Sequence, residues 1–548
     1  MAERQESGIF WIVLLALLLL TRLPATASYF SIDNVNLALS LEKFDPRVHQ
    51  PQPPGYPFFV LFARMVNLLF SDTERTFRLI SLLVSGAAIC AAFALANAMF
   101  SGWAGMAAAF LLLVNPVFWH AGLDGPLRPN LALFSLLTAY CCWRCWNGEK
   151  RFAYWGAFTL GVGSGVRPDL IAFLFPLWFI SSWIGTKSWL SVLRALALLA
   201  AIVAVWVGVL VIAMGGVAQF MSVMLGYAAE QSGQGSVVFG SSIVNWIRQI
   251  NRLVIWNGLA VIGWIWAVPF CFGRTDHPLP LGEGRVRVSG FAEPVTLTRR
   301  ASRVGLSQRE RHFFFLWLVP GLIIQALVHV DAPGHTLFSV AALCVLGGYL
   351  LSLVRGRDFA LAAALLVNAI FFLDFFELPA GVSNLPGRTP SITNAVLYGS
   401  FEASLGMVRG LDEITRTTLK EIEEFTPGDR PSVIITTNVH MDQWFMNWRI
   451  GRYYLPEREF WVIYNNSEPK RVERIRRDAT LEMRETAPLR IPLFSEGRIL
   501  WLIEPGSAFH KQLATAQKLQ GGKYVFYSDI ARDSPPFTID GVEIVPKT

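Results

Sequence analysis

Apolar runs long enough to cross a lipid bilayer recur along this chain, and they constrain its fold more than any other feature. A spanning helix needs about 20 predominantly apolar residues to cross about 30 Å of hydrocarbon. Of the 548 residues, 53% are hydrophobic and only 16% are charged, which excludes a wholly soluble chain. The sequence therefore predicts a polytopic α-helical membrane protein.

A window of spanning length predicts about eleven membrane helices in the first 378 residues. Their approximate ranges are 8–26, 77–98, 102–119, 130–146, 153–165, 169–184, 195–213, 253–272, 312–330, 335–354 and 358–377. The first run has a weak likeness to a signal peptide, but the chain re-enters lipid many times. We therefore expect a retained first span, with cleavage as the alternative. Residues 56–70 form a shorter run with Arg64 in its middle, which favours a helix lying in the membrane interface.

Basic residues in the connections set the expected orientation. With a cytoplasmic N-terminus, every inner connection after residue 100 carries Lys or Arg, as the positive-inside rule requires. Segment 273–311 has about eight arginines and little periodicity, so it is predicted to be a disordered cytoplasmic loop. Much of the net charge of +7 sits in such connections, and no nucleic-acid partner is implied.

The same orientation sends a set of ionisable side chains to the outer face of the membrane. They are Asp33, Asp45, His49, Asp124, Arg128, Arg167, Asp169, Glu230, Arg248, His329, Asp331 and His335. Each alone could be an interfacial anchor, but ionisable groups near membrane depth are costly, and the whole set indicates a functional site. The outer segment 214–245 is rich in Gly and Ser, which is compatible with a mobile lid or with a plain flexible connection.

Segment 28–57, just outside the first helix, is the best candidate for a reaction centre. It contains the pair Asp33-Asn34, then His49, then the run Gln52-Pro53-Pro54-Gly55-Tyr56-Pro57. Proline fixes its own backbone, removes a donor and keeps the preceding residue extended, so the polar side chains of this run would be held in place. The structural alternative is a rigid turn between a span and an interfacial helix.

Residues 386–548 have the pattern of a soluble domain. Short apolar strands such as 431–437 and 459–464 alternate with helical segments, which predicts an α/β domain with a mostly parallel sheet. An odd number of spans precedes it, so it is expected on the outer, periplasmic side. It contains no Gly-rich nucleotide-binding motif. A scaffold or acceptor-docking role is expected.

The order of these motifs resembles the opening of the GT-C membrane glycosyltransferases. These include the protein O-mannosyltransferases, the lipid A aminoarabinose transferases and the bacterial PMT_2 and DUF2723-like proteins. Similar elements are the acid Asp33 soon after the first helix and the Pro-Pro segment before a surface helix. Further similar elements are Val114-Asn115-Pro116-Val117-Phe118-Trp119, Gly165-Val166-Arg167-Pro168-Asp169 and Gly334-His335-Thr336-Leu337-Phe338. The likeness covers roughly residues 8 to 378 and implies a transmembrane catalytic domain, 1–378, in a bacterial inner membrane.

The resemblance also implies roles for individual residues. Asp33 matches the acid that acts as base toward an acceptor hydroxyl, while a polyprenyl-phosphate sugar is attacked with inversion. Asn34 stands where many relatives have a second acid, which argues against a metal bridged by paired carboxylates, and no cofactor is firmly implied. Gln52 stands where the aminoarabinose branch has a Lys. Further candidates for the substrate and phosphate site are His49, Tyr56, Arg128, Arg167, Arg248 and His335.

The expected function is therefore transfer of a monosaccharide to an acceptor hydroxyl that belongs to a glycan, a lipid or a protein. General bases and positioned cations suit such a reaction. Two alternatives remain: a transporter or flippase of a lipid-linked or small substrate, and a non-catalytic sensor whose outer domain binds a ligand. A transporter would place charged groups at the midplane of two related halves. Here the charges gather at one face.

Overall fold

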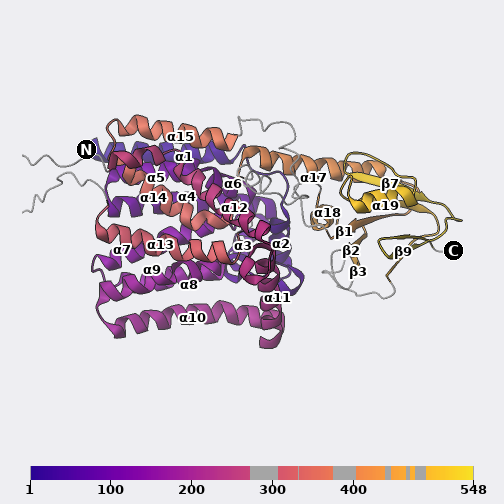
Figure 1. Ribbon diagram of the computed structural model, residues 1–548, viewed down its shortest axis with the longest axis horizontal. Coiled ribbons are helices and arrows are strands. Elements are labelled where there is room, and N and C mark those ends of the chain that lie inside the picture. Colours follow the sequence, from indigo (N-terminus) through magenta and orange to yellow (C-terminus); the bar gives the residue numbers. More distant parts are fainter. Residues whose placement is uncertain are drawn as a thin grey trace, which may run out of the picture.

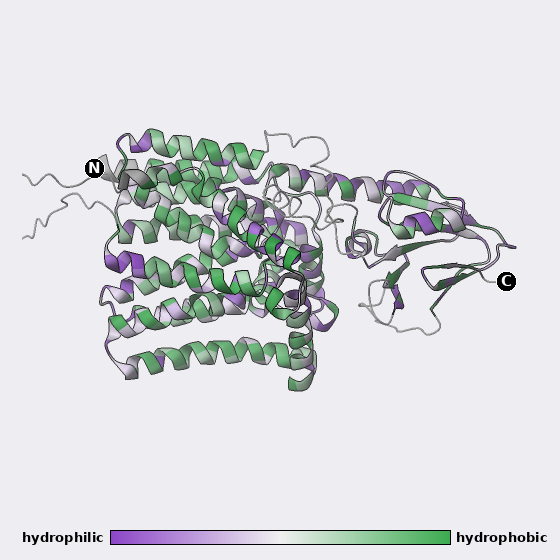
Figure 2. Cartoon of the chain, viewed as in Figure 1, coloured by the Kyte–Doolittle hydropathy of each residue, from purple (hydrophilic) through white to green (hydrophobic). Residues whose placement is uncertain are grey.

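The computed structural model describes residues 2–271, 306–330, 332–373, 403–438, 446–464, 470–475 and 489–546. Long helices run side by side, and a domain built on β-strands lies beyond one end of this bundle (Figure 1). Hydrophobic residues dominate the helices of the bundle, whereas hydrophilic residues are frequent in the C-terminal domain (Figure 2). The N-terminus lies at the opposite end of the bundle from that domain.

The helices of the bundle follow the apolar runs of the sequence. They are α1 (Ala2–Arg22), α2 (Ile32–Glu42), α3 (Pro57–Phe70), α4 (Thr73–Met99), α5 (Gly102–Val114), α6 (Pro116–Asp124), α7 (Pro129–Trp146), α8 (Phe152–Val166), α9 (Asp169–Thr186), α10 (Trp189–Met214), α11 (Val217–Gly235), α12 (Ile243–Val261), α13 (Gln308–Leu327), α14 (Leu337–Ser352) and α15 (Arg357–Leu373). Each expected span overlaps one of these helices.

Fewer of these helices are long and apolar enough to span a membrane than the sequence predicts. Within the described ranges, four segments are long and apolar enough: α4, α9, α10 and Pro333–Ser352. The bent pair of α5 and α6 would make a fifth. The chain is thus a multi-pass helical membrane protein, and the expected number of about eleven spans stays a prediction, as does the interfacial position of α3.

The expected span 102–119 is two helices with a bend of 54° between them. Asn115 is fully buried at the break, and its side-chain oxygen accepts a hydrogen bond from the backbone N–H of Phe118 at 3.1 Å. Pro116 begins α6, where its missing N–H costs nothing because the first turn of a helix has no internal acceptor for it. The bend redirects α6, whose last residue is Asp124.

Two connections contain more helix than the sequence suggests. Segment 214–245 was expected to be a mobile lid or a flexible connection, but it contains α11, the 3-10 turn η2 (Val237–Phe239) and the start of α12. Gly215 and Gly216, with φ of 88° and 125°, make the turn from α10 into α11. Of the expected cytoplasmic loop 273–311, residues 273–305 lie outside the described part of the chain. Residues 308–311 of that segment belong to α13. That helix begins after a capping box formed by Ser307 and Glu310.

The described part of the C-terminal domain contains a mixed six-stranded sheet and a second sheet of three strands. The strands of the two sheets are, in chain order, β1 (Ser432–Thr437), β2 (Phe460–Tyr464), β3 (Arg471–Ile475), β4 (Arg490–Pro492), β5 (Gly497–Leu502), β6 (Gln520–Gly521), β7 (Val525–Ile530), β8 (Phe537–Ile539) and β9 (Val542–Val545). The larger sheet has the order β3-β2-β1-β5-β7-β6, and β4, β9 and β8 form a second sheet. The helices are α17 (Leu405–Phe425), α18 (Trp448–Tyr454) and α19 (Ala508–Ala516).

The expectation of a mostly parallel sheet is wrong. Only β1 pairs in parallel with both of its neighbours, β2 and β5, whereas β2–β3, β5–β7 and β6–β7 are antiparallel. Few residues separate β2 from β3 and β6 from β7, and such short connections return the chain antiparallel, since a parallel neighbour requires a long crossover. The boundary expected near 378–386 lies outside the described residues.

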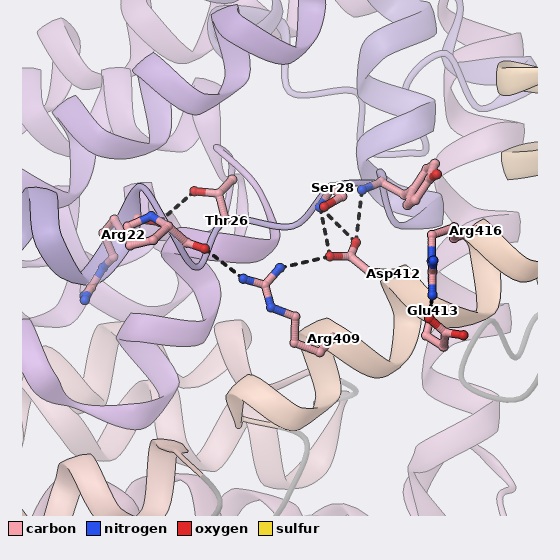
Figure 3. A network of polar contacts seen from close by, with 9 residues as sticks. Arg22, Thr26, Ser28, Arg409, Asp412, Glu413 and Arg416 are labelled. Atoms are coloured by element: carbon pink, nitrogen blue, oxygen red, sulfur yellow. Dashed lines mark hydrogen bonds and ion pairs between the residues drawn. The ribbon is translucent and has the colours of Figure 1, made fainter.

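Helix α17 ties this domain to the chain just after α1 (Figure 3). The carboxylate of Asp412 accepts hydrogen bonds from the backbone N–H groups of Ser28 and Tyr29 at 2.9 to 3.0 Å. Arg409 donates to the carbonyl of Pro24 at 2.8 Å and to Asp412 at 3.3 Å. These contacts join segments almost 400 positions apart and fix the start of the loop that leads to Asp33.

Candidate active site

A cavity of about 570 Å³, lined by both charged and apolar side chains, lies where α2, α6, α9 and α11 meet the C-terminal domain. Helices α2, α3 and α11 stand at the end of the bundle nearest to that domain (Figure 1). Of the site residues expected from the sequence, all but Arg248 line this cavity: Asp33, Asn34, His49, Gln52, Tyr56, Arg128, Arg167 and His335. Residues far apart in sequence are therefore brought to one place, although their chemical roles stay predictions.

Asp33 and Arg128 form the central ion pair of the cavity. Oδ2 of Asp33 lies 3.1 Å from Nη2 of Arg128, and Nη1 of Arg128 lies 3.2 Å from Oδ2 of Asp124. Burial alone would lower the pKa of Arg128, but the carboxylates of Asp124 and Asp33 raise it above its ordinary value. Arg128 is thus a permanent cation between two acids. The Asp33 side chain is 41% exposed, so its carboxylate remains open to a ligand.

The position of Arg128 depends on a close approach to Gly334. A Cβ atom at position 334 would lie 2.5 Å from Cδ of Arg128, which is shorter than such contacts allow. Gly334 precedes His335 in the 3-10 turn η4 (Pro333–Thr336), which leads directly into α14. The motif Gly334-His335 therefore has two effects: the absence of a side chain at Gly334 leaves room for Arg128, and the His335 side chain lines the cavity.

Arg167 and Asp169 form a second ion pair at the junction of α8 and α9. Nη2 of Arg167 lies 2.8 Å from Oδ2 of Asp169, which is the first residue of α9. The guanidinium also lies 5.9 Å from the ring centroid of Tyr56. Burial opposes ionisation, but Asp169 and Tyr56 raise the pKa of Arg167 above its ordinary value. Two permanent cations, Arg128 and Arg167, consequently line the same cavity.

Asn34 has a clear structural contact in addition to lining the cavity. Its Nδ2 donates to the carbonyl of Asp124 at 2.5 Å and to Oγ of Ser31 at 2.9 Å. A Cβ atom at position 125 would lie 2.1 Å from Oδ1 of Asn34, so Gly125 is required here. The amide of Asn34 thus holds α2 against the end of α6.

The proline-rich segment has an unusual backbone. His49 and Tyr56 adopt left-handed conformations, with φ of 60° and 45°, which is uncommon for residues other than Gly. Gln52 is 7% exposed, and its Oε1 has no hydrogen-bond partner in the described part of the chain. A buried amide oxygen without a partner is costly, so it is a candidate acceptor for a ligand donor. Pro57 begins α3, as the expected surface helix requires.

His335 lines the cavity next to the end of α13. Its carbonyl accepts a hydrogen bond from Nε2 of Gln325 at 2.6 Å, and its ring lies 5.8 Å from the ring of His329. Both rings line the cavity, as does Gln325. The last turns of α13 and the turn η4 therefore supply this wall.

Several lining residues are absent from the site expected from the sequence. Asp124, Asp169, Glu230 and His329 belong to the outer-face set but had no assigned role. Tyr227 and Gln231 lie on α11, whose helix was not expected, and Arg449 comes from the C-terminal domain. Asp45 and Arg248 are not among the lining residues, and Asp331 lies outside the described residues. No group of three or more His, Cys, Asp or Glu able to hold a metal ion occurs in the described segments.

Comparisons with known proteins bear on this geometry. Residues 50–212 match the model of the family described as dolichyl-phosphate-mannose-protein mannosyltransferase. A comparison with curated protein sequences finds no match. The crystal structure of ArnT from Cupriavidus metallidurans bound to undecaprenyl phosphate is similar, with a TM-score of 0.57 at 13% identity. That alignment covers 96% of this chain and 98% of the other.

The apo structure of the same ArnT gives a TM-score of 0.56 at 14% identity, with 97% and 99% of the two chains covered. At such low identity the likeness shows a shared fold, and it extends over the bundle and the C-terminal domain. The family match adds an independent sequence relationship that includes Gln52, Arg128 and Arg167. The resemblance expected from the sequence is thus confirmed as a family match over residues 50–212 and as a fold shared with ArnT.

Proposed function

We propose that this chain transfers a monosaccharide from a polyprenyl-phosphate donor to an acceptor hydroxyl, with inversion at the anomeric carbon. The observation that carries the proposal is the cavity in which an accessible carboxylate, Asp33, lies beside the permanent cations Arg128 and Arg167. The family match to dolichyl-phosphate-mannose-protein mannosyltransferases supports a lipid-phosphate sugar as donor. The ArnT structure with bound undecaprenyl phosphate supports a polyprenyl chain.

Asp33 would serve as the base. Its Oδ2 is held by Arg128, while the side chain keeps enough exposure to accept a proton from an acceptor hydroxyl. The oxygen of that hydroxyl would attack the anomeric carbon as the bond to the phosphate breaks, and the phosphate would leave with the bonding electron pair. Such proton transfer by a positioned base contributes roughly 10²–10⁴ in rate.

Arg128 and Arg167 would stabilise the leaving phosphate. Both guanidinium groups line the cavity and are paired with carboxylates on only part of their donor groups. A guanidinium has five N–H donors in a fixed plane and binds phosphate oxygens in pairs. Charge that develops on the phosphate oxygens would therefore meet preorganised donors. His49, Gln52, Tyr56 and His335 would line the sugar and phosphate path.

The cavity would open at the outer face of a bacterial inner membrane, with the N-terminus in the cytoplasm. The basic connections 144–151, 187–194 and 355–357 lie away from the cavity and support this orientation through the positive-inside rule. Residues 1–378 would then form the catalytic domain in contact with membrane lipids. Residues 386–548 would form a periplasmic domain.

Transport of a lipid-linked substrate is the main competing function, and a sensor is the second. A transporter concentrates its charged groups near the membrane midplane, on interrupted helices. In this chain the charged groups line a cavity at one end of the bundle, beside the C-terminal domain. That position favours chemistry at a membrane surface.

Substitution of Asp33 tests the proposal. Asp33→Asn keeps the size of the side chain but removes the base, so we expect transfer from a panel of radiolabelled polyprenyl-phosphate sugars to fall by about 10² or more. Glu42→Gln is the matched control, because Glu42 is an exposed acid at the other end of α2. Equal elution in gel filtration would show that both variants fold. Transfer at the wild-type rate by Asp33→Asn would overturn the assignment of the base.

A further inference from the structure

The C-terminal domain contributes a cation to the membrane-side cavity. Arg449 lies on α18, in the first turn after the cap Asn447, and its side chain lines the cavity together with Asp33, Arg128 and Arg167. Helix α18 contacts α2, the helix that carries Asp33. Tyr454, at the end of α18, accepts a hydrogen bond from the backbone N–H of Phe30 at 2.9 Å. These contacts hold Arg449, a residue of the C-terminal domain, next to the candidate active site in the helical bundle.

Arg449 differs from the other two arginines in its partners. Arg128 pairs with Asp33 and Asp124, and Arg167 pairs with Asp169. For Arg449 no carboxylate lies within ion-pair distance among the described residues, and its buried Nε has no hydrogen-bond partner there. The acids whose charges act on Arg449 are Glu473 in its own domain and Asp33 and Glu230 in the cavity. Glu473 already lies 3.2 Å from Arg471.

Arg449 is half-buried and its Nε atom is fully covered, which makes this arrangement costly without a further anion. Desolvation lowers the pKa of Arg449 below its ordinary value, although the distant acids act in the opposite direction. Buried charges in native proteins are paired with opposite charges or with ligands. The ring of Trp448, 5.2 Å from the guanidinium carbon, provides a stacking surface but no negative charge. The donors of Arg449 are therefore available to a ligand in the cavity.

Given the glycosyl transfer proposed above, on which this inference rests, we propose that Arg449 binds an anionic oxygen group, phosphate or carboxylate, of a substrate in the cavity. The C-terminal domain would then complete the binding site as well as cover it. The anion has two sources that share this chemistry. One is the phosphate of the lipid donor, and the other is an acidic group on a soluble acceptor that enters from the side of the C-terminal domain.

Ligand binding without turnover tests the proposal. We would measure the dissociation constants of undecaprenyl phosphate and of inorganic phosphate for the full chain in lipid nanodiscs, using intrinsic tryptophan fluorescence. The variants are Arg449→Met, Arg449→Lys and, as the matched control, Arg452→Met. Arg452 lies three residues further along α18 and does not line the cavity. Thermal unfolding of each variant reports whether the domain remains folded.

Loss of one charge-assisted hydrogen bond predicts a weakening of at least about tenfold for Arg449→Met. We expect Arg449→Lys to recover part of the loss and Arg452→Met to bind like the wild type. A loss for undecaprenyl phosphate would support the proposal and assign the donor as the source, whereas a loss for inorganic phosphate alone would support it and assign a soluble acceptor. Unchanged constants for both ligands in a folded Arg449→Met protein would overturn it.

These binding constants separate the inference from the proposed function. If no polyprenyl-phosphate sugar were transferred and Arg449→Met still lost affinity, the anion-binding role of Arg449 would be supported and the proposed glycosyl transfer would be overturned. If transfer occurred and the affinities of Arg449→Met were unchanged, the proposed glycosyl transfer would be supported and the anion-binding role of Arg449 would be overturned.

Discussion

The Oδ2 atom of Asp33 lies 3.1 Å from Nη2 of Arg128, although the two residues are 95 positions apart. The pair joins α2 to the loop between α6 and α7, and Asp124 extends it by a second ion pair at 3.2 Å. Arg128 is largely buried, whereas Asp33 is the more exposed partner. One cation can therefore orient the proposed base and also present remaining donors to a phosphate.

Replacement of Arg128 is expected to damage both functions of this cation. Arg128→Gln would leave Asp124 as a buried acid without a charge partner and would release Asp33 from its orientation. We expect the transfer rate to fall by about 10² or more, comparable with loss of one preorganised donor in other enzymes. Arg128→Lys keeps the charge but not the planar fork, so an intermediate rate is expected. A wild-type rate for Arg128→Gln, measured with the radiolabelled donors, would contradict this role.

Gly334→Ala tests the same cation without changing a charge. The added methyl group would meet Cδ of Arg128 at 2.5 Å, so the arginine side chain or the turn η4 must shift. Overpacking of this kind costs about 1–3 kcal/mol of stability, and the displacement of Arg128 should lower the transfer rate as well as the melting temperature. Gly258→Ala is the control, since a Cβ at that position of α12 meets no atom within 4 Å. Equal rates for the two variants would show that Arg128 does not need its observed position.

The sequence was sufficient to predict the helical membrane fold and the gathering of the site. Spanning runs depend on local composition, so every expected span overlaps a helix. Asp33, Arg128 and Arg167 could be grouped because loop charges indicate which ends of the helices share a face. The pairing of Asp33 with Arg128 rather than with Arg167, and the bend of 54° between α5 and α6, depend on packing between helices that a hydropathy window does not describe.

Other features required three-dimensional contacts. The Gly and Ser residues of segment 214–245 suggested a loop. The Met, Leu and Ala residues between them favour a helix, and the segment forms α11. Strand direction in the C-terminal domain depends on connection lengths that a pattern of alternating elements does not define. Arg449 lines the cavity from a domain whose helices α17 and α18 contact the segment after α1, and nothing in its local sequence distinguishes it from other arginines of that domain.

The docking contact at Asp412 should be measurable as stability. Asp412→Ala would leave the partly buried backbone N–H groups of Ser28 and Tyr29 without their acceptor, and each such hydrogen bond contributes about 0.5–1.5 kcal/mol. We expect a lower melting temperature and faster hydrogen exchange in the segment after α1. Glu413→Ala is the neighbouring control, because Glu413 pairs with Arg416 on the exposed face of α17, where water screens the two charges (Figure 3). Exchange that is equal in both variants would show that Asp412 does not fasten the domain.

A different acid, Asp45, should make stability depend on pH. Burial alone would raise its pKa, but the hydrogen bonds and charge of Arg47, 2.8 Å away, bring the pKa below its ordinary value of 3.8. An acid whose folded pKa is depressed stabilises the folded state above its unfolded pKa, and that contribution is lost as the pH falls through the folded pKa. The melting temperature of the wild type should therefore exceed that of Asp45→Asn at pH 7, and the difference should shrink as the pH falls below 3.8. Thermal unfolding of both proteins in the same nanodiscs between pH 3 and 7 would measure it. A difference that stays constant over this range would mean that Asp45 stabilises the loop by its shape alone.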